Sequence, residues 1–200
     1  MLYTIGYSSF FEPEELINRL KAEKISYLFD VRTFPYSNAF PQYNKEDFSK
    51  KLHSQSINYN FLGDFVGGLI VKNTVRKGIN SLKDLIKNEK IKKGLNYLYK
   101  KSKTNNIAVM CAEKSPFDCH RFLAVASTLH FYTDAKIKNI IADKTLSFEE
   151  SIELWKKENK LQSLKLKDEE LILQRLIKLY KIDNKREEKF PTKIKNLKLF

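Results

Sequence analysis

The sequence predicts an α/β fold: a single three-layer domain with a mostly parallel central sheet, flanking helices and a C-terminal helical extension. Short apolar runs alternate with amphipathic helical patterns, which is typical of α/β domains. The first ~30 residues follow the order strand, helix, strand, and such a unit forms a parallel strand pair. The 200 residues, 42% of them hydrophobic, suit one compact domain.

The first half of the chain begins this alternation. The apolar run Leu2–Ile5 ends at Gly6 and predicts a buried strand. A helix with one apolar face is expected from Pro13 to about Glu23, because Pro suits a first helical turn. Ile25–Val31, rich in aromatic and branched residues, predicts the second strand. The segments expected next are a functional loop over 33–44, a helix over 45–54, a strand Ile57–Leu62, a turn Gly63–Gly68, and irregular or mobile structure over 69–90.

The second half continues the same pattern. We expect a helix Lys92–Ser102, a strand Ile107–Cys111, a helix 119–131, a strand Ala135–Ala142, and helices near 147–160 and 168–181. The stretch after Asp183 is basic and is expected to be loosely held. The predicted organisation is an α/β core over 1–145 and a helical extension over 146–200 that packs on the core and ends in the basic tail.

Composition narrows the class of protein. No apolar run reaches the length needed to span a bilayer, and the N-terminus lacks the pattern of a secretory signal. The chain has two cysteines, which indicates a reducing compartment rather than a disulfide scaffold. We therefore expect a cytoplasmic protein with no membrane partner. Its oligomeric state is left open.

The formal net charge of +13 has two readings. It could mark a nucleic-acid partner, or it could reflect a compositional preference for lysine, since six of the 37 basic residues are arginine and 31 are lysine. Arginine is therefore the more informative residue here, because its planar group binds carboxylate or phosphate in a way that lysine cannot.

Residues 109–121 concentrate the reactive side chains of the chain. Both cysteines, Cys111 and Cys119, lie in this stretch, with His120 and Arg121 directly after the second. A thiol at a helix N-terminus gains thiolate character, so Cys119 is a candidate nucleophile or redox thiol with His120 as acid or base. The alternative is that Cys119 packs in the core while His120 and Arg121 bind backbone carbonyl groups.

Other candidate residues follow predicted strands. Asp30 and Arg32 share one side of a strand end, where Asp30 could act as a base and Arg32 could bind an anion, or the two could form a structural ion pair. Ser8 could present its hydroxyl and backbone N–H to an anion. Glu113 and Lys114 could hold a polar group of a ligand, or could form a solvated ion pair.

A metal site is a weaker interpretation of the same residues. Cys111, Cys119 and His120 offer three ligands and Glu113 a fourth. The seven residues between the cysteines do not match the short spacing of structural zinc sites. We expect no metal and no other cofactor, and leave open whether the two cysteines pair.

Several short motifs occur together in one order: Thr4-Ile5-Gly6-Tyr7-Ser8, Asp30-Val31-Arg32 with Pro35 and Ser37, Leu62-Gly63 with Gly67-Gly68, and Cys111-Ala112-Glu113 through Cys119-His120-Arg121. Over about residues 2–142 this series resembles the domain of unknown function family 488. Tyr7 stands where many relatives have a histidine. The resemblance implies the fold and the site, but no reaction.

These signals converge on one crevice at the carboxyl end of the sheet. The predicted catalytic residues are Asp30, Glu113, Cys119 and His120, and the predicted ligand-binding residues are Ser8, Arg32, Lys114 and Arg121. The expected ligand is an anionic small molecule or nucleic acid, either a nucleotide or an oligonucleotide, and the sequence does not decide whether the protein is an enzyme. The alternatives are a non-catalytic nucleic-acid-binding module and a rhodanese-like enzyme of thiol or sulfur transfer.

Overall fold

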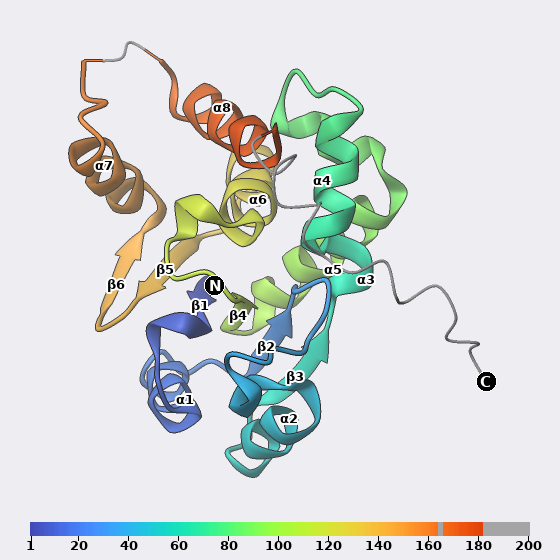
Figure 1. The fold of residues 1–200 in the computed structure, drawn as a ribbon, viewed down its shortest axis with the longest axis vertical. Coiled ribbons are helices and arrows are strands. Elements are labelled where there is room, and N and C mark those ends of the chain that lie inside the picture. The colour runs from blue at the N-terminus through green and yellow to red at the C-terminus, as the bar shows by residue number, and fades with distance from the viewer. Residues whose placement is uncertain (164–165, 182–200) are drawn as a thin grey trace.

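A six-stranded sheet forms the centre of the protein in this computed structural model, which describes residues 1–163 and 166–181 (Figure 1). The strand order is β3-β2-β4-β1-β5-β6. Strands β1 to β5 pair in parallel, and β6 pairs antiparallel with β5. The bounds are β1 Leu2–Gly6, β2 Tyr27–Asp30, β3 Asn58–Phe61, β4 Ile107–Cys111, β5 Ile137–Ile141 and β6 Lys144–Ser147. The predicted mostly parallel sheet is confirmed.

The two central strands, β1 and β4, set the position of the site. Their register aligns Gly6 with Cys111, so both strands end at the same level. After β1 the chain continues into α1 (Pro13–Ala22) on one face of the sheet, and after β4 it continues into helices on the other face. Neighbouring parallel strands whose connections diverge in this way leave a crevice beyond their carboxyl ends.

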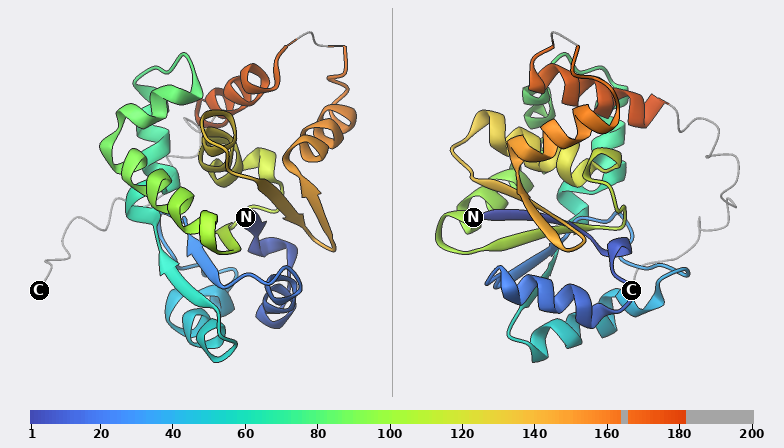
Figure 2. Two further views of the ribbon diagram at one scale, coloured as in Figure 1. Left: turned by 180° about the vertical axis from the view of Figure 1, so that it is seen from behind. Right: turned by 90° about the vertical axis from the view of Figure 1, so that its left-hand side faces the viewer.

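Helices α1 and α2 (Lys45–Ser54) cover one face of the sheet, as the views in Figure 2 show. Both are amphipathic, and their apolar residues recur at helical spacing. Leu16 and Leu20 of α1 and Phe48 of α2 are buried in one cluster with strand residues such as Ile5 and Met110. This layer was predicted from the sequence and is confirmed.

The other face carries the remaining helices and a larger core cluster, which includes Val109, Phe122 and Leu176. These elements are α3 (Gly63–Val66), α4 (Gly68–Arg76), η3 (Leu82–Lys87), α5 (Glu89–Thr104), the π-helix η5 (Arg121–Ala126), α6 (Ser127–Tyr132), α7 (Phe148–Glu158) and α8 (Asp168–Lys181). The short 3₁₀ turns are η1 (Tyr7–Ser9), η2 (Pro41–Tyr43) and η4 (Pro116–Asp118). Helices on both faces make the three layers that the sequence predicted.

Two expectations were wrong. Residues 69–90 are not irregular, because they form most of α4 and all of η3, with Val71, Val75 and Leu85 buried. The predicted turn Gly63–Gly68 is instead helix α3 followed by the first residue of α4. In addition, an edge strand that was not predicted, β6, precedes α7, and it is reached through a turn in which Ala142 has a φ of 52°.

The C-terminal helices pack on the α/β core. Ile152 of α7 and Ile172 and Leu176 of α8 belong to the same buried cluster as the sheet. The division at residue 145 stays a prediction, and the predicted basic tail after Asp183 lies outside the described residues. In the part of the chain that is described, no helix combines the length and the apolar character needed to cross a membrane.

Candidate functional site

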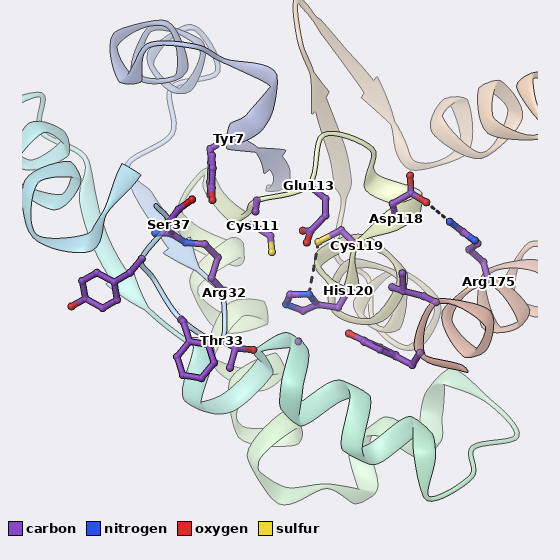
Figure 3. A pocket seen from close by; sticks show the side chains of 16 residues that line it. Tyr7, Arg32, Thr33, Ser37, Cys111, Glu113, Asp118, Cys119, His120 and Arg175 are labelled. Carbon is purple, nitrogen blue, oxygen red and sulfur yellow. Dashed lines mark hydrogen bonds and ion pairs between the residues drawn. The ribbon is translucent and has the colours of Figure 1, made fainter. Parts of the chain in front are cut away.

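A cavity of about 690 Å³ opens at the carboxyl ends of β1, β2 and β4 (Figure 3). This volume lies in the range of small-molecule sites. The lining residues come from five parts of the chain: the turn after β1, the loop after β2, the start of α4, the end of β4 with the segment after it, and the second half of α8. They are Tyr7, Arg32, Thr33, Phe34, Tyr36, Ser37, Gly68, Cys111, Ala112, Glu113, Asp118, Cys119, His120, Arg175, Leu179 and Tyr180.

The floor of this pocket brings the two cysteines together. Cys111 is the last residue of β4, and the turn η4 leads the chain back so that Cys119 lies beside it. Both thiols are free and buried, with Cys119 only 1% exposed. The sulfur atoms of both cysteines and one nitrogen of His120 all lie within 4.8 Å of one another.

His120 is held in a fixed orientation. Its Nε2 lies 2.9 Å from the carbonyl oxygen of Val31, so Nε2 donates to that carbonyl. Its Nδ1 consequently faces the sulfur of Cys119 at 3.8 Å. The backbone N–H of Arg121 also points to this sulfur, at 3.5 Å. The sulfur of Cys119 is therefore in contact with both the imidazole of His120 and the backbone N–H of Arg121.

The surroundings make Cys119 the more acidic of the two thiols. Burial by itself would raise the pKa of Cys119, but the hydrogen bond from Cys111 and the positive charges of Arg121 and His120 outweigh it and hold that pKa well below its usual range. The pKa of Cys111 is raised, because it hydrogen-bonds to Cys119 and is itself buried. The two thiols therefore titrate as a coupled pair, in which Cys119 is the more acidic member.

The Cys119 sulfur also shifts the pKa values of its neighbours Glu113 and His120. The pKa of the Glu113 carboxyl is raised by burial among protein atoms and by the charge of Cys119. Burial would lower the pKa of His120, but the Cys119 thiolate opposes this effect and the net shift is upward. Figure 3 shows the Glu113 carboxyl group directed toward the two sulfurs. The floor is therefore a compact group of four titratable side chains.

Arg121 fixes the segment that carries these groups. It is 1% exposed, and its Nη1 and Nη2 donate to the carbonyl oxygens of Glu113 and Lys114 at 2.6 and 3.2 Å. It begins the π-helix η5, an uncommon turn that is frequent at functional sites. Arg121 does not line the pocket. Its guanidinium group holds the backbone of residues 113–114 without itself lining the pocket.

One wall of the pocket carries the other buried guanidinium group. Arg32 donates through Nε and Nη2 to the carboxylate of Asp30, at 3.0 and 2.5 Å, and through Nη2 to the carbonyl of Tyr43 at 2.9 Å. Asp30 also accepts from the hydroxyl of Tyr59 at 2.7 Å. Tyr7 lies against the guanidinium plane, with 5.1 Å between its ring centre and Cζ. These contacts hold the guanidinium group of Arg32 in one position, and Asp30 balances its positive charge.

Arg32 nevertheless has one donor left over. Its Nη1 is buried and has no hydrogen-bond partner among the described residues, although Arg32 lines the pocket. A buried polar group without a partner is uncommon and costs about 1–3 kcal/mol. This atom marks a place where a ligand acceptor would be favourable.

The opposite wall belongs to α8. Arg175 bonds to the carbonyl of Phe117 at 2.9 Å and forms an ion pair with Asp118, which ties α8 to the turn η4 (Figure 3). Leu179 and Tyr180 continue this wall. Asp118 and Arg175 thus neutralise each other at the pocket edge.

The structure brings together four of the predicted site residues and separates the other four. Arg32, Glu113, Cys119 and His120 line one pocket. Asp30 is fully buried behind Arg32, and Arg121 is turned to the backbone, as the structural alternatives described. Lys114 lines a second, mostly apolar cavity beside Trp155, and the backbone N–H of Ser8 donates to Ala112 at 3.1 Å. The functional roles of all eight stay predictions.

Some lining residues were not predicted. Phe34, Tyr36 and Ser37 belong to the loop over 33–44, whose aromatic content did indicate a functional segment. Arg175 was visible as one of the six arginines, but its position in a helical pattern gave no reason to select it. No sequence signal indicated Leu179 and Tyr180.

A family model described as domain of unknown function DUF488 matches residues 12–127. The match includes the wall at Arg32 and the floor from Cys111 to His120, and it ends before α7 and α8. No curated protein and no solved structure matches the chain.

Proposed function

The chain belongs to the family described as domain of unknown function DUF488, whose description assigns no activity, and we propose that its pocket binds a small anionic ligand of the nucleotide type. The unpartnered Nη1 of Arg32 carries this proposal. A guanidinium N–H is the donor that proteins favour for phosphate and carboxylate oxygens. Because Arg32 is held in the pocket wall, its Nη1 would bind the anionic group of the ligand at one defined position.

Outside the floor group of Glu113, Cys119 and His120, the charges around the pocket are balanced, which leaves room for an anion at the Arg32 wall. The pair Asp118–Arg175 is neutral, and Asp30 balances Arg32 without occupying Nη1. Gly68, the first residue of α4, lines the pocket, and the N-terminal end of a helix carries partial positive charge. An oxygen anion near Arg32 would therefore meet a donor and a favourable helix dipole.

The aromatic rim supports a ligand with a planar ring. Phe34 and Tyr36 line the pocket and are 73% and 55% exposed, so their rings are accessible to a ligand. Rings of this kind stack on nucleobases. A nucleotide with its phosphate at Arg32 and its base on this rim fits these features, and the floor residues Glu113, Cys119 and His120 would then be the catalytic groups. Free thiols in the floor are consistent with the reducing cytoplasm expected from the sequence.

Binding of adenosine and guanosine monophosphates by calorimetry tests the proposal. We expect wild-type protein to bind one of them and Arg32→Lys to bind it about tenfold more weakly, because loss of a charged hydrogen bond costs about 1.5 kcal/mol or more. Arg19→Lys is the matched control, since Arg19 lies in α1, away from the pocket.

Equal affinity in wild type and Arg32→Lys would reject the proposal. The same measurement with a single-stranded oligonucleotide separates the main alternative. Tight, strongly salt-dependent binding that survives Arg32→Lys would instead indicate a lysine-driven nucleic-acid-binding module.

A further inference from the structure

We propose that the floor of the pocket binds one zinc ion, or another soft divalent metal ion, through Cys111 Sγ, Cys119 Sγ and His120 Nδ1. The sequence analysis expected no metal, because the spacing of the cysteines is not that of a zinc knuckle. The folded chain supplies what the spacing lacks, since β4 and the turn η4 return the chain to one point. The convergence of the three donor atoms within 4.8 Å carries the inference.

The distances suit tetrahedral coordination. Zinc bonds of about 2.3 Å to sulfur and about 2.0 Å to nitrogen place neighbouring ligand atoms about 3.5–3.8 Å apart. Cys119 Sγ and His120 Nδ1 are 3.8 Å apart. Only small side-chain movements are therefore needed to bring all three atoms onto one ion.

The atoms behind the ligands are arranged as in metal sites. A metal-binding histidine usually donates its second ring nitrogen to a carbonyl or carboxylate, which fixes the ring and its tautomer. His120 Nε2 does this toward Val31 O at 2.9 Å and leaves Nδ1 facing the sulfurs. The N–H of Arg121 directed at Cys119 Sγ is a second outer contact of this kind.

Space and charge favour the same conclusion. Gly68 leaves Nδ1 accessible, because a Cβ at this position would lie 3.3 Å from that atom. Two adjacent buried thiolates would repel each other, and a divalent cation would balance both charges. Sulfur and imidazole are ligands that favour zinc over magnesium or calcium.

The coordination would be of the catalytic type. Three protein ligands with a remaining position toward solvent distinguish catalytic zinc from closed structural sites. All three ligands line the pocket, and so does Glu113, whose carboxyl group is directed toward the sulfurs (Figure 3). Glu113 would thus face the fourth position, where it could orient a metal-bound water. This assignment does not depend on the nucleotide ligand proposed above.

The test is the metal content of the full chain, purified under reducing conditions and measured by mass spectrometry after dialysis. We expect one zinc ion per chain in wild type and in His53→Gln, a control at an exposed histidine of α2. Cys111→Ser and Cys119→Ser are expected to lose the metal while keeping the wild-type circular dichroism spectrum. Arg32→Lys is expected to keep it, which separates this test from the test of ligand binding.

Cobalt substitution of the wild-type protein gives a readout that does not depend on the folding of the variants. Thiolate coordination produces an intense sulfur-to-cobalt charge-transfer absorption, and zinc is expected to displace it. Absence of this absorption, metal content well below one ion per chain after incubation with zinc, or equal metal in Cys119→Ser would each overturn the assignment. A disulfide between the two cysteines in the freshly reduced and dialysed protein would do the same.

Discussion

Arg32 and Arg121 are both buried guanidinium groups, but Arg32 lines the pocket and Arg121 does not, and the two make different contacts. Arg121 uses its terminal nitrogens on the carbonyl groups of Glu113 and Lys114 and does not reach the pocket. Arg32 is balanced by Asp30 and keeps Nη1 without a partner. The same side chain therefore serves as a backbone clamp in one segment and as a positioned donor in the other. Among the described residues each keeps one buried nitrogen without a hydrogen-bond partner, Nη1 in Arg32 and Nε in Arg121, and the difference is that Arg32 lines the pocket.

The largest expected effect lies on the Arg121 side, at Gly6. A Cβ at this position would lie 1.9 Å from the carbonyl oxygen of Glu113 and 3.0 Å from Arg121 Nη2. Gly6→Ala should therefore reduce the free energy of unfolding by about 4 kcal/mol, because backbone atoms must move apart. Chemical denaturation followed by circular dichroism measures this.

Gly78→Ala is the matched control for that variant. Gly78 has a φ of 94° but has no atoms close enough to meet a Cβ, so only conformational strain of about 1 kcal/mol is expected. Similar losses in the two variants would show that close packing against Glu113 does not govern Gly6.

A smaller effect is expected from Asp30→Asn on the Arg32 side. The substitution leaves a buried guanidinium without its counter-ion, so the free energy of unfolding should fall by about 3 kcal/mol. Because the charge of Arg32 would no longer be balanced by a carboxylate, affinity for a phosphate ligand should rise. Denaturation and calorimetry of the same sample measure the two changes, which should have opposite signs.

Asp47→Asn removes an exposed carboxylate that pairs with Lys50 and should change stability by less than about 0.5 kcal/mol. If Asp30→Asn behaved like this surface variant, the pair with Arg32 would not be the structural support of the wall.

Apart from the two control variants, the smallest effect is expected from exchanging each arginine for lysine. Arg121→Lys should lose about 2 kcal/mol of stability, because one ammonium group cannot replace the fork that binds two carbonyls. Arg32→Lys should lose less, since lysine can keep the pair with Asp30, yet it should weaken ligand binding more. Measuring stability and affinity for both variants checks the contrast, and the reverse ranking in either quantity would contradict it.

The fold was largely predictable because its signals are local. Leu16, Ile17 and Leu20 recur at helical spacing, and this periodicity predicted the helix. The short apolar run Ile107–Cys111 predicted the strand. Helix α4 was missed because it is short, begins at Gly68 and contains β-branched residues such as Val71 and Val75, which have a weak helix propensity. Its stability comes from packing with α3 and α8, which no local pattern reveals.

The edge strand β6 was missed for a related reason. Lys144–Ser147 contains one apolar residue, and its pairing with β5 follows from the turn at Ala142, whose positive φ is uncommon outside glycine and asparagine. Neither the composition of Lys144–Ser147 nor the turn at Ala142 predicts a strand from the sequence alone. The strand exists because β5 offers a partner.

The candidate site was predictable in its position but not in the direction of each side chain. A pocket lies at the strand ends and at the Cys119-His120 motif that the sequence had indicated. Arg121 points away from it because the π-helix starts there, and Asp30 is covered because Arg32 folds over it. These orientations are set by individual hydrogen bonds, from Arg121 to the carbonyls of Glu113 and Lys114 and from Arg32 to Asp30, which residue spacing does not predict.

The wall supplied by α8 has a consequence for diversity among relatives. Residues 12–127, which match the family model, contain the two cysteines, the imidazole and Arg32, whereas Arg175, Leu179 and Tyr180 come from outside it. A change in α8 would therefore alter this wall without altering Arg32, the two cysteines or His120. Replacing α8 with the corresponding helix of a relative would change the side chains of this wall and leave the floor residues of the pocket as they are.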